Sequence, residues 1–397
     1  MIQKLIQTIT RRIPEEHIAI GHDWLVSARG GEKILQAIAQ CFPKATIYTL
    51  FYDKEIATAL GIRNPVKVSF LGKLPFVRYY YRYLFFLYPW AIRALSPPNA
   101  KLILTTSHTL IKNLRSRAPH ISITYIFAPL RYLYARKKDY LDISRFYRWT
   151  EPLIRPLLQM IKRWDKQNHP HINKYLTISK FIAQQVKEVY DQDAEVIYPF
   201  YNNQLFKLPQ SPLPIPERKY FLLLGALVPY KLPNIVLEAF AHRLPYQLKV
   251  VGTGPMFHKL QKKYSQATNI KFEGFVPDSE LPQLYQNAKA LIFPGIEDFG
   301  IVPLEAAACG CPVIAYPHGG IVESLREHFW PISEQTPHGI YEAITAFLHS
   351  EHDIVALTNA VKDFTTENFQ KRFLLIVSKT LTTSRTSTND ISMYEPF

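Results

Sequence analysis

Short apolar runs alternate with helix-like segments along this chain, and the alternation limits the fold more than any other feature. In the first half, the runs of strand length are 18–20, 45–50, 102–105 and 121–127. The second half repeats the pattern at 220–224, 248–251, 270–272, 290–293 and 313–315. The helix-like segments are 32–40, 181–190, 234–242, 256–266, 279–287 and 301–309. This order predicts the α/β class, with parallel sheets covered by helices on both faces.

A proline-rich stretch separates the two series. Residues 208–218 contain four prolines, and that density excludes a helix interior or a central strand. A length of 397 residues favours two domains. We therefore predict a Rossmann-like domain over 1–207, a stiff linker over 208–218 and a second Rossmann-like domain over 219–365. A last helix is predicted at 366–380, and the Ser/Thr-rich residues 381–397 are expected to form a disordered tail.

The positive charge of the chain lies in its first half. The net charge is +15, and residues 1–199 contain 30 Lys and Arg but only 14 Asp and Glu. Within 67–95, basic residues interleave with aromatic ones, which is typical of a segment in the head-group layer of an anionic membrane. An aromatic segment packed into the first domain is the alternative. Aromatic and basic residues also stack nucleic-acid bases, but no nucleic-acid module is visible, so we expect no nucleic-acid partner.

Other composition features exclude several classes. No apolar run reaches the length of a membrane-spanning helix, and the N-terminus lacks the apolar core of a signal peptide. The three cysteines are too few for a disulfide framework or a zinc site. We therefore expect a cytoplasmic protein with reduced, buried cysteines and no metal site.

Residues 288–316 carry the strongest functional pattern. An apolar strand is followed by a loop, and Gly300 begins a helical pattern with Pro303 in its first turn, where a proline is tolerated. Gly310 and Pro312 end the helix before the next strand. The amides of residues 299–302 should then converge at the positive end of the helix, which suits a phosphate. Glu297 would lie at the rim of that pocket and Glu305 one turn deeper; a solvated acidic helix start is the simpler alternative.

This stretch resembles a known signature. Residues 297–306 are similar to the Glu-x7-Glu motif of glycosyltransferase family 4, the group 1 enzymes, and in particular to its mannosyltransferase-like members. Further segments resemble family elements in the same order: 22–25, 30–32, 227–231, 251–255, 272–276 and 319–323. The resemblance covers roughly residues 17–375. It implies the GT-B fold, in which two Rossmann-like domains face each other across a cleft, and a retaining, metal-independent transfer.

The resemblance also implies roles for residues. Glu297 would be the catalytic residue that faces the donor sugar, Glu305 would hold the nucleotide ribose, and Lys231 would contact phosphate. Gly30 and Gly31 would let the backbone approach the diphosphate. The alternative interpretation of the two glycines is a plain turn that enters a helix, and the alternative for Lys231 is a solvated surface lysine. The remaining predicted donor-binding residues are Asp298, Phe299, Gly300, Ile301, Val302, Gly252 and Val276.

Residues of the first half are candidates for the acceptor side, and two positions depart from the family pattern. The acceptor-side candidates are His22, Asp23, His108 and Arg131, for each of which a structural role is the alternative. Phe127 stands where relatives have a histidine, and a phenyl ring cannot exchange a proton. Ala226 stands where they have an arginine, and losing one such donor costs roughly 3–4 kcal/mol in other enzymes. A non-catalytic GT-B scaffold that binds nucleotide is therefore the rival prediction.

The resemblance implies a transfer reaction as the function. We expect a hexose, with mannose tried first, to move from a nucleoside diphosphate sugar to a lipid-linked or cell-surface glycan acceptor, as in polysaccharide or lipopolysaccharide biosynthesis. No cofactor beyond the donor substrate is expected. The predicted location is the inner face of the plasma membrane, to which residues 67–95 would attach the protein peripherally.

Overall fold

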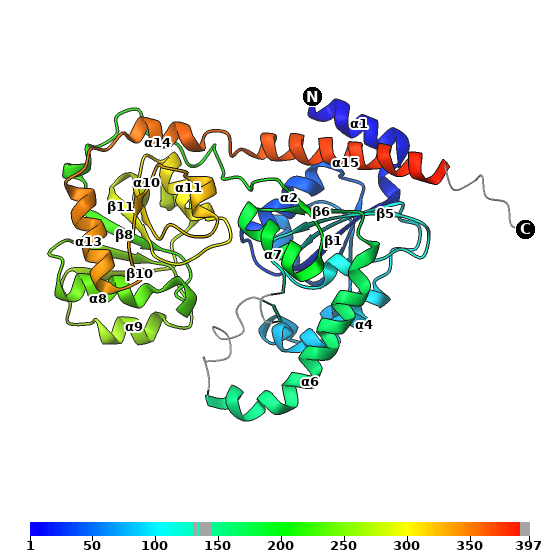
Figure 1. Cartoon of the computed structure of the whole chain (residues 1–397), viewed down its shortest axis with the longest axis horizontal. Coiled ribbons are helices and arrows are strands. Elements are labelled where there is room, and N and C mark those ends of the chain that lie inside the picture. Colours follow the sequence, from blue (N-terminus) through cyan, green and yellow to red (C-terminus); the bar gives the residue numbers. More distant parts are fainter. Residues whose placement is uncertain (131–132, 135–144, 390–397) are drawn as a thin grey trace, which may run out of the picture. The chain divides into compact units, whose positions relative to one another are not determined.

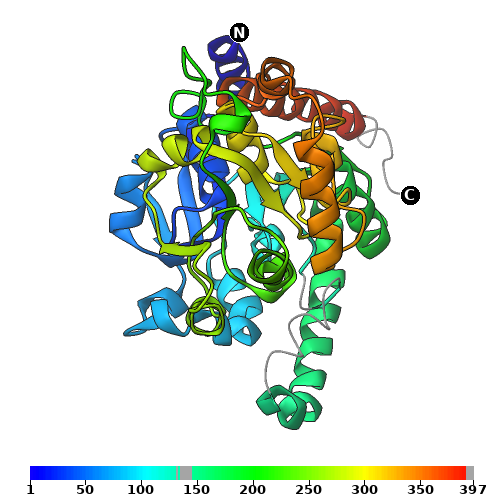
Figure 2. The same cartoon turned by 90° about the vertical axis from the view of Figure 1, so that its left-hand side faces the viewer.

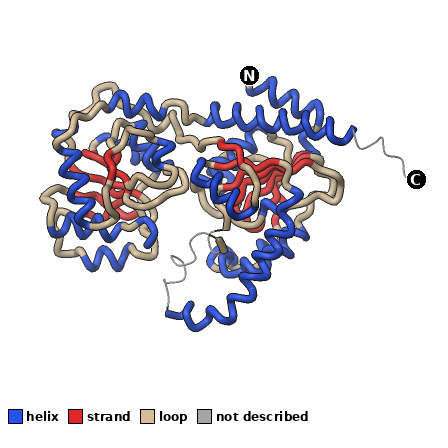
Figure 3. Tube along the Cα trace, viewed as in Figure 1, coloured by secondary structure: helices blue, strands red, loops and turns tan. Residues whose placement is uncertain are grey.

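The computed structural model describes residues 1–130, 133–134 and 145–389, and its chain forms two compact units (Figure 1). Unit 1 comprises Met1–Tyr198 together with the chain from Glu367 onward, and unit 2 comprises Pro199–Thr366. Each unit contains a single parallel sheet flanked by helices, which is the arrangement that the alternating apolar runs predict (Figure 3).

Unit 1 is built on a seven-stranded sheet in the order β3-β2-β1-β4-β5-β6-β7, and all neighbouring strands are parallel. The strands are β1 (Ile18–Leu25), β2 (Thr46–Tyr52), β3 (Val66–Val68), β4 (Leu102–Ser107), β5 (Ile121–Ile126), β6 (Lys174–Thr177) and β7 (Ala194–Val196). The α-helices are α1 (Ile2–Arg12), α2 (Gly30–Cys41), α3 (Lys54–Ala59), α4 (Tyr88–Ala94), α6 (Arg145–Asn168), α7 (Lys180–Tyr190) and α15 (Thr366–Asn389). Between β3 and α4 the chain forms the 3₁₀ helices η2 (Phe70–Lys73), η3 (Val77–Tyr79) and η4 (Tyr81–Leu87).

Unit 2 has a six-stranded parallel sheet in the order β10-β9-β8-β11-β12-β13. Its strands are β8 (Tyr220–Leu224), β9 (Leu248–Val251), β10 (Ile270–Gly274), β11 (Ala288–Phe293), β12 (Val313–Ala315) and β13 (Trp330–Pro331). Its α-helices are α8 (Pro233–His242), α9 (Phe257–Lys263), α10 (Leu281–Gln286), α11 (Ile301–Ala308), α12 (Ile321–Ser324), α13 (Pro337–Leu348) and α14 (Ile354–Val361). Residues of β8, β11 and β12 are almost fully buried because helices cover both faces of the sheet.

The proline-rich stretch 208–218, for which we predict a stiff linker, belongs to unit 2 and contributes two buried residues to it. Ile215 joins the core of unit 2, and the Arg218 side chain is buried, where it donates to the carbonyl oxygens of Leu213, Ala288 and Gly310. The four prolines themselves are exposed or half-buried, so Ile215 and Arg218 are the buried residues that attach this stretch to unit 2. Contacts place the unit boundary at Tyr198 and Pro199, upstream of the prolines.

The last helix, α15, lies in unit 1 alongside α1, and Figures 1 and 2 show the two helices side by side. Arg12 donates to the hydroxyl of Thr382 at 2.6 Å, and Phe369 meets Tyr125 with ring centroids 5.6 Å apart. The helix continues to Asn389, past residue 381 where we predicted disorder, and 390–397 lie outside the described residues. Within the described residues, no helix is both long and apolar enough to cross a membrane.

Candidate active site

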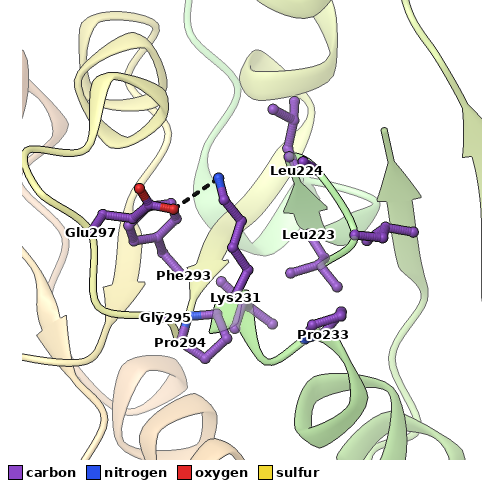
Figure 4. A pocket seen from close by; sticks show the side chains of 12 residues that line it. Leu223, Leu224, Lys231, Pro233, Phe293, Pro294, Gly295 and Glu297 are labelled. Atoms are coloured by element: carbon purple, nitrogen blue, oxygen red, sulfur yellow. Dashed lines mark ion pairs between the residues drawn. The ribbon is translucent and has the colours of Figure 1, made fainter. Parts of the chain in front are cut away.

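A pocket in unit 2 lies where β8 and β11 end side by side. From β8 the chain adds strands β9 and β10 toward one edge of the sheet, and from β11 it adds β12 and β13 toward the other edge. The strand order therefore reverses between β8 and β11, which is the position where open α/β sheets bind ligands. The loop after β8 and the loop after β11 form its walls. Its lining residues are 223–227, Lys231, Pro233 and 292–295 with Glu297 (Figure 4).

Two of the predicted site residues meet in this pocket. The Lys231 ammonium lies 2.9 Å from Oε1 of Glu297, and Figure 4 shows the lysine side chain reaching across the pocket toward the carboxylate. The two side chains are 23% and 18% exposed, so a ligand can still reach them. Lys231 is the only cationic side chain among the lining residues, which also include the uncharged Ala226. One ammonium must therefore supply all the side-chain positive charge that this pocket offers an anion.

Glycines bring the loops around the pocket together. Gly225 and Gly252 have φ of 142° and 119°, and a Cβ on Gly252 would lie 2.1 Å from the carbonyl oxygen of Gly225. A Cβ on Gly295 would lie 2.9 Å from the Cα of Lys231. The loop that carries Glu297 is held by the amide of Gly320, which donates to the Glu297 carbonyl at 2.8 Å. Gly252 was a donor-binding candidate, and the structure gives it a packing role.

The predicted helix after Glu297 is present, and Gly300 caps it with a left-handed backbone, φ 92°. Ile301 and Val302 are half-buried in its first turn, where backbone N–H groups have no intrahelical acceptor. Phe299 is buried and packs against Phe364, so its side chain supports the loop. Asp298 is half-buried next to it.

Glu305 is not among the residues that line the pocket. Its side chain is 7% exposed, and Oε2 accepts a hydrogen bond from the Tyr285 hydroxyl at 3.2 Å. Burial, and then the charge of Glu305, raise the pKa of Tyr285 well above its ordinary value, so the phenol stays a donor. Val276 is half-buried two residues after β10, and it too lies outside the pocket lining. The structure thus brings Glu297 and Lys231 together and leaves Glu305 beside Tyr285.

Asp23 has a structural role in unit 1. Its carboxylate is fully buried and accepts hydrogen bonds from the backbone amides of residues 108–111 and from the hydroxyls of Ser107 and Thr109. Burial raises its pKa, but His108 and these hydrogen bonds outweigh burial and hold the pKa below its ordinary value. The carboxylate therefore cages the turn after β4, and it has no oxygen left for an acceptor. We had placed Asp23 on the acceptor side.

His22, Gly31, His108 and Phe127 gather at the carboxyl ends of β1, β4 and β5. The imidazole of His22 is buried, with Nδ1 2.7 Å from the Thr106 hydroxyl, while Nε2 has no hydrogen-bond partner among the described residues. Burial lowers the pKa of His22 to about 4, so the ring is neutral near pH 7. His108 packs against Phe127 with ring centroids 5.5 Å apart. A Cβ added to Gly31 would lie 3.5 Å from the Phe127 ring and 3.6 Å from the His108 ring, so Gly31 is in close contact with both.

Two further candidates complete the comparison. Gly30 opens α2 and is half-buried, and Glu32 caps this helix end by accepting from the Arg29 amide and the Ser27 hydroxyl. Arg131 lies outside the described residues. Sequence reasoning missed Tyr285 as the partner of Glu305 and Gly295 as the contact of Lys231. The only available signal was the Pro294-Gly295 pair at the end of an apolar run, because the partners are far apart along the chain.

Comparison with known proteins finds a family match that lies almost entirely in the second unit. Residues 207–364 match the family described as glycosyl transferases group 1. A D-inositol 3-phosphate glycosyltransferase from Streptomyces bingchenggensis is 34% identical over 130 residues, which is 28% of either chain. An O-antigen chain mannosyltransferase B from Escherichia coli is 27% identical over 196 residues, or 44% of this chain and 50% of that protein. The matched stretches therefore span half or less of these two relatives.

Solved structures agree over nearly the whole chain. Anabaena HepE, in complex with UDP and glucose, superposes with a TM-score of 0.61 at 18% identity, covering 91% of this chain and all of that one. The lipopolysaccharide outer core galactosyltransferase WaaB gives a TM-score of 0.59 at 16% identity, covering 90% and 97% of the two chains. Identity at this level speaks for the fold alone. The predicted GT-B architecture of two Rossmann-like domains is confirmed.

Proposed function

We propose that this chain is a retaining glycosyltransferase, because it has the GT-B fold and its residues 207–364 match the group 1 glycosyl transferases. It transfers a hexose from a nucleoside diphosphate sugar to a lipid-linked or cell-surface glycan acceptor. The observation that carries the proposal is the Lys231–Glu297 pair in a pocket at the carboxyl ends of β8 and β11.

Charge changes at the leaving group explain the role of Lys231. The departing diphosphate gains negative charge in the transition state, and a cation placed there lowers the barrier. Lys231 is the cationic side chain of the pocket, and the first-turn amides of α11 add the positive end of a helix dipole nearby in the chain. Glu297 lies within ion-pair distance of Lys231, and we assign it to the donor sugar next to the diphosphate. When the donor binds, the phosphate replaces the carboxylate as the partner of Lys231.

The proposed donor and acceptor are inferred from similar proteins. One protein that is 32% identical over 126 residues is a GDP-mannose-dependent mannosyltransferase of phosphatidylinositol monomannoside from Mycolicibacterium smegmatis. Together with the O-antigen mannosyltransferase, it makes GDP-mannose the first donor to test, followed by UDP-sugars because HepE binds UDP and glucose. We further propose that no metal is required and that the protein works peripherally at the cytoplasmic face of the plasma membrane.

A donor panel tests the proposal. Purified protein is incubated with GDP-mannose or UDP-hexoses and a lipid-extract acceptor, with and without EDTA, and released nucleoside diphosphate is measured. We expect release with one donor, resistance to EDTA and loss of activity in Glu297→Ala, and the product anomer measured by NMR reports on retention. Equal silence of wild type and variant across all donors, with intact GDP or UDP binding, would instead support the nucleotide-binding scaffold.

A further inference from the structure

Unit 1 contains a second depression, at the outer edge of its sheet. It has a volume of about 620 Å³, which is within the usual size range of small-molecule sites. Lys67 of the edge strand β3 and Lys73 at the end of η2 contribute its cations, and Tyr48, Tyr52 and Ser96 contribute hydroxyls. We call these five residues the edge site. None of the residues that line the depression is acidic.

The charge of the edge site is not neutralised by its own part of the chain. No Asp or Glu occurs anywhere between Glu55 and Asp139. Both lysines are exposed, and the Lys67 ammonium lies 5.6 Å from the ring centre of Tyr48, its register partner on β2. Ammonium groups in this setting, with hydroxyl donors beside them, suit a phosphate group.

Exposed aromatic rings follow directly after Lys73. Most of η4 packs into the core of unit 1, where Tyr81 is buried and the side chains of residues 84–87 pack against it. Phe76 before η3, Tyr79 at the end of η3 and Tyr83 of η4 are 78%, 70% and 76% exposed. Such rings are costly in water, because nothing in the described part of unit 1 covers them.

A third cation lies against one of the exposed rings. The Arg78 guanidinium lies 4.8 Å from the centre of the Tyr79 ring and donates to its hydroxyl. Trp90 of α4 is also half-exposed, at 49%. Aromatic side chains with one apolar and one polar end concentrate at the membrane–water interface, and neighbouring Lys and Arg bind anionic lipids. A nucleotide-sugar site in unit 2 gives no reason for this combination in unit 1.

We propose that the edge site binds the phosphate of a membrane lipid head group while Phe76, Tyr79 and Tyr83 enter the interfacial layer of the bilayer. The proposal rests on the membrane acceptor of the proposed function and names the residues that contact the lipid. The rings anchor the protein in the interface, and Lys67 and Lys73 select phosphate-bearing surfaces. A lipid is favoured over a soluble phosphate because a soluble ligand leaves the rings uncovered.

Vesicle sedimentation of the full chain without donor tests the edge site. Vesicles of phosphatidylcholine are compared with vesicles that also contain phosphatidylglycerol. We expect wild type to bind the anionic vesicles and Lys67→Ala/Lys73→Ala to bind them about thirtyfold more weakly, since each basic residue near an anionic surface contributes about 1 kcal/mol. Lys44→Ala/Lys101→Ala is the matched control, because both lysines are exposed, lie in unit 1 and change the net charge equally. Equal loss in the two double variants would reduce the edge site to general charge and overturn the proposal.

The rings are tested separately. Phe76→Ser/Tyr79→Ser/Tyr83→Ser should abolish sedimentation, whereas Phe275→Ser, which removes a ring that is 75% exposed in unit 2, should leave it unchanged. Glycerol phosphate in solution should not displace the wild type from vesicles; displacement would identify a soluble phosphate as the ligand and contradict the proposal. If the wild type transfers sugar but binds none of the vesicles, the lipid site is refuted and the proposed transferase activity stands. If it binds vesicles but transfers sugar from none of the donors, the transferase activity is refuted and the lipid site stands.

Discussion

Releasing Lys231 from Glu297 should tighten nucleotide binding while it stops transfer. In the structure the ammonium lies 2.9 Å from the carboxylate, and both side chains are about one-fifth exposed. An ion pair with this much solvent contact contributes about 1 kcal/mol at most. A nucleoside diphosphate that binds Lys231 must therefore first displace the Glu297 carboxylate from it. The neutral isostere Glu297→Gln removes the competition, and we expect GDP or UDP to bind about fivefold more tightly.

Calorimetry with GDP and UDP measures this effect, and Lys231→Ala is its counterpart. Loss of the pocket cation should weaken binding by about ten- to a hundredfold, because hydrogen bonds to charged groups contribute about 1.5–3 kcal/mol. The Glu297→Gln variant should lose transfer in the same preparations. Weaker nucleotide binding by Glu297→Gln would mean that the carboxylate, and not Lys231 alone, contacts the nucleotide, and the competition argument would be refuted.

The other predictions concern stability. Gly252→Ala should lower the urea midpoint by an amount equivalent to at least about 2 kcal/mol because the new methyl collides with the neighbouring loop, whereas Gly61→Ala, with φ of 66° but no atom within 4 Å, should cost about 1 kcal/mol; equal costs would deny the close approach. The pKa of His22 is about 4 in the folded protein against 6.5 ordinarily, so the unfolded chain binds the proton first as the pH is lowered. The free energy of unfolding should therefore fall by about 3 kcal/mol as the pH drops from 6.5 to 4. Urea unfolding at several pH values should show a smaller fall for His22→Gln, and an unchanged pH dependence would contradict the assignment. Lys112 and Asp165 form a fully buried ion pair, and Lys112→Met should cost about 3–5 kcal/mol; adding Asp165→Leu should restore part of that in thermal unfolding, and a further loss in the double variant would oppose this reasoning.

Local patterns predicted the elements around the site well. The strand, helix and strand expected within 288–316 appear as β11, α11 and β12, with α11 starting at Ile301 as the pattern indicated. Helix α6, by contrast, was missed, because Pro152 and Pro156 lie within it and proline normally argues against a helix interior. Strand β3, three residues long, was missed because so short a run has no readable periodicity.

The site residues divide along the same physical line. The motif around Glu297 and the loop with Lys231 were recognisable, but their contact was not, because β8 and β11 become neighbours only through the strand order of the sheet. Asp23 reads as a candidate ligand in the sequence, and only the folded turn after β4 shows that all its acceptor capacity is used. The same holds for the exposed rings of Phe76, Tyr79 and Tyr83, because only the folded chain shows that Tyr81 between them is buried while they are not.

The amino-acid sequence by itself determined the α/β class, most of the element boundaries in unit 2 and the residues that could serve a nucleotide sugar. Backbone preferences and apolar periodicity act over a few neighbouring residues, so they can be read without the fold. Tertiary structure alone decided that Ile215 and Arg218 of the proline-rich stretch are buried, that Glu305 contacts Tyr285 and that one lysine pairs with Glu297. These outcomes depend on groups distant in sequence, whose meeting is settled when the sheets assemble and each buried polar atom must find a partner.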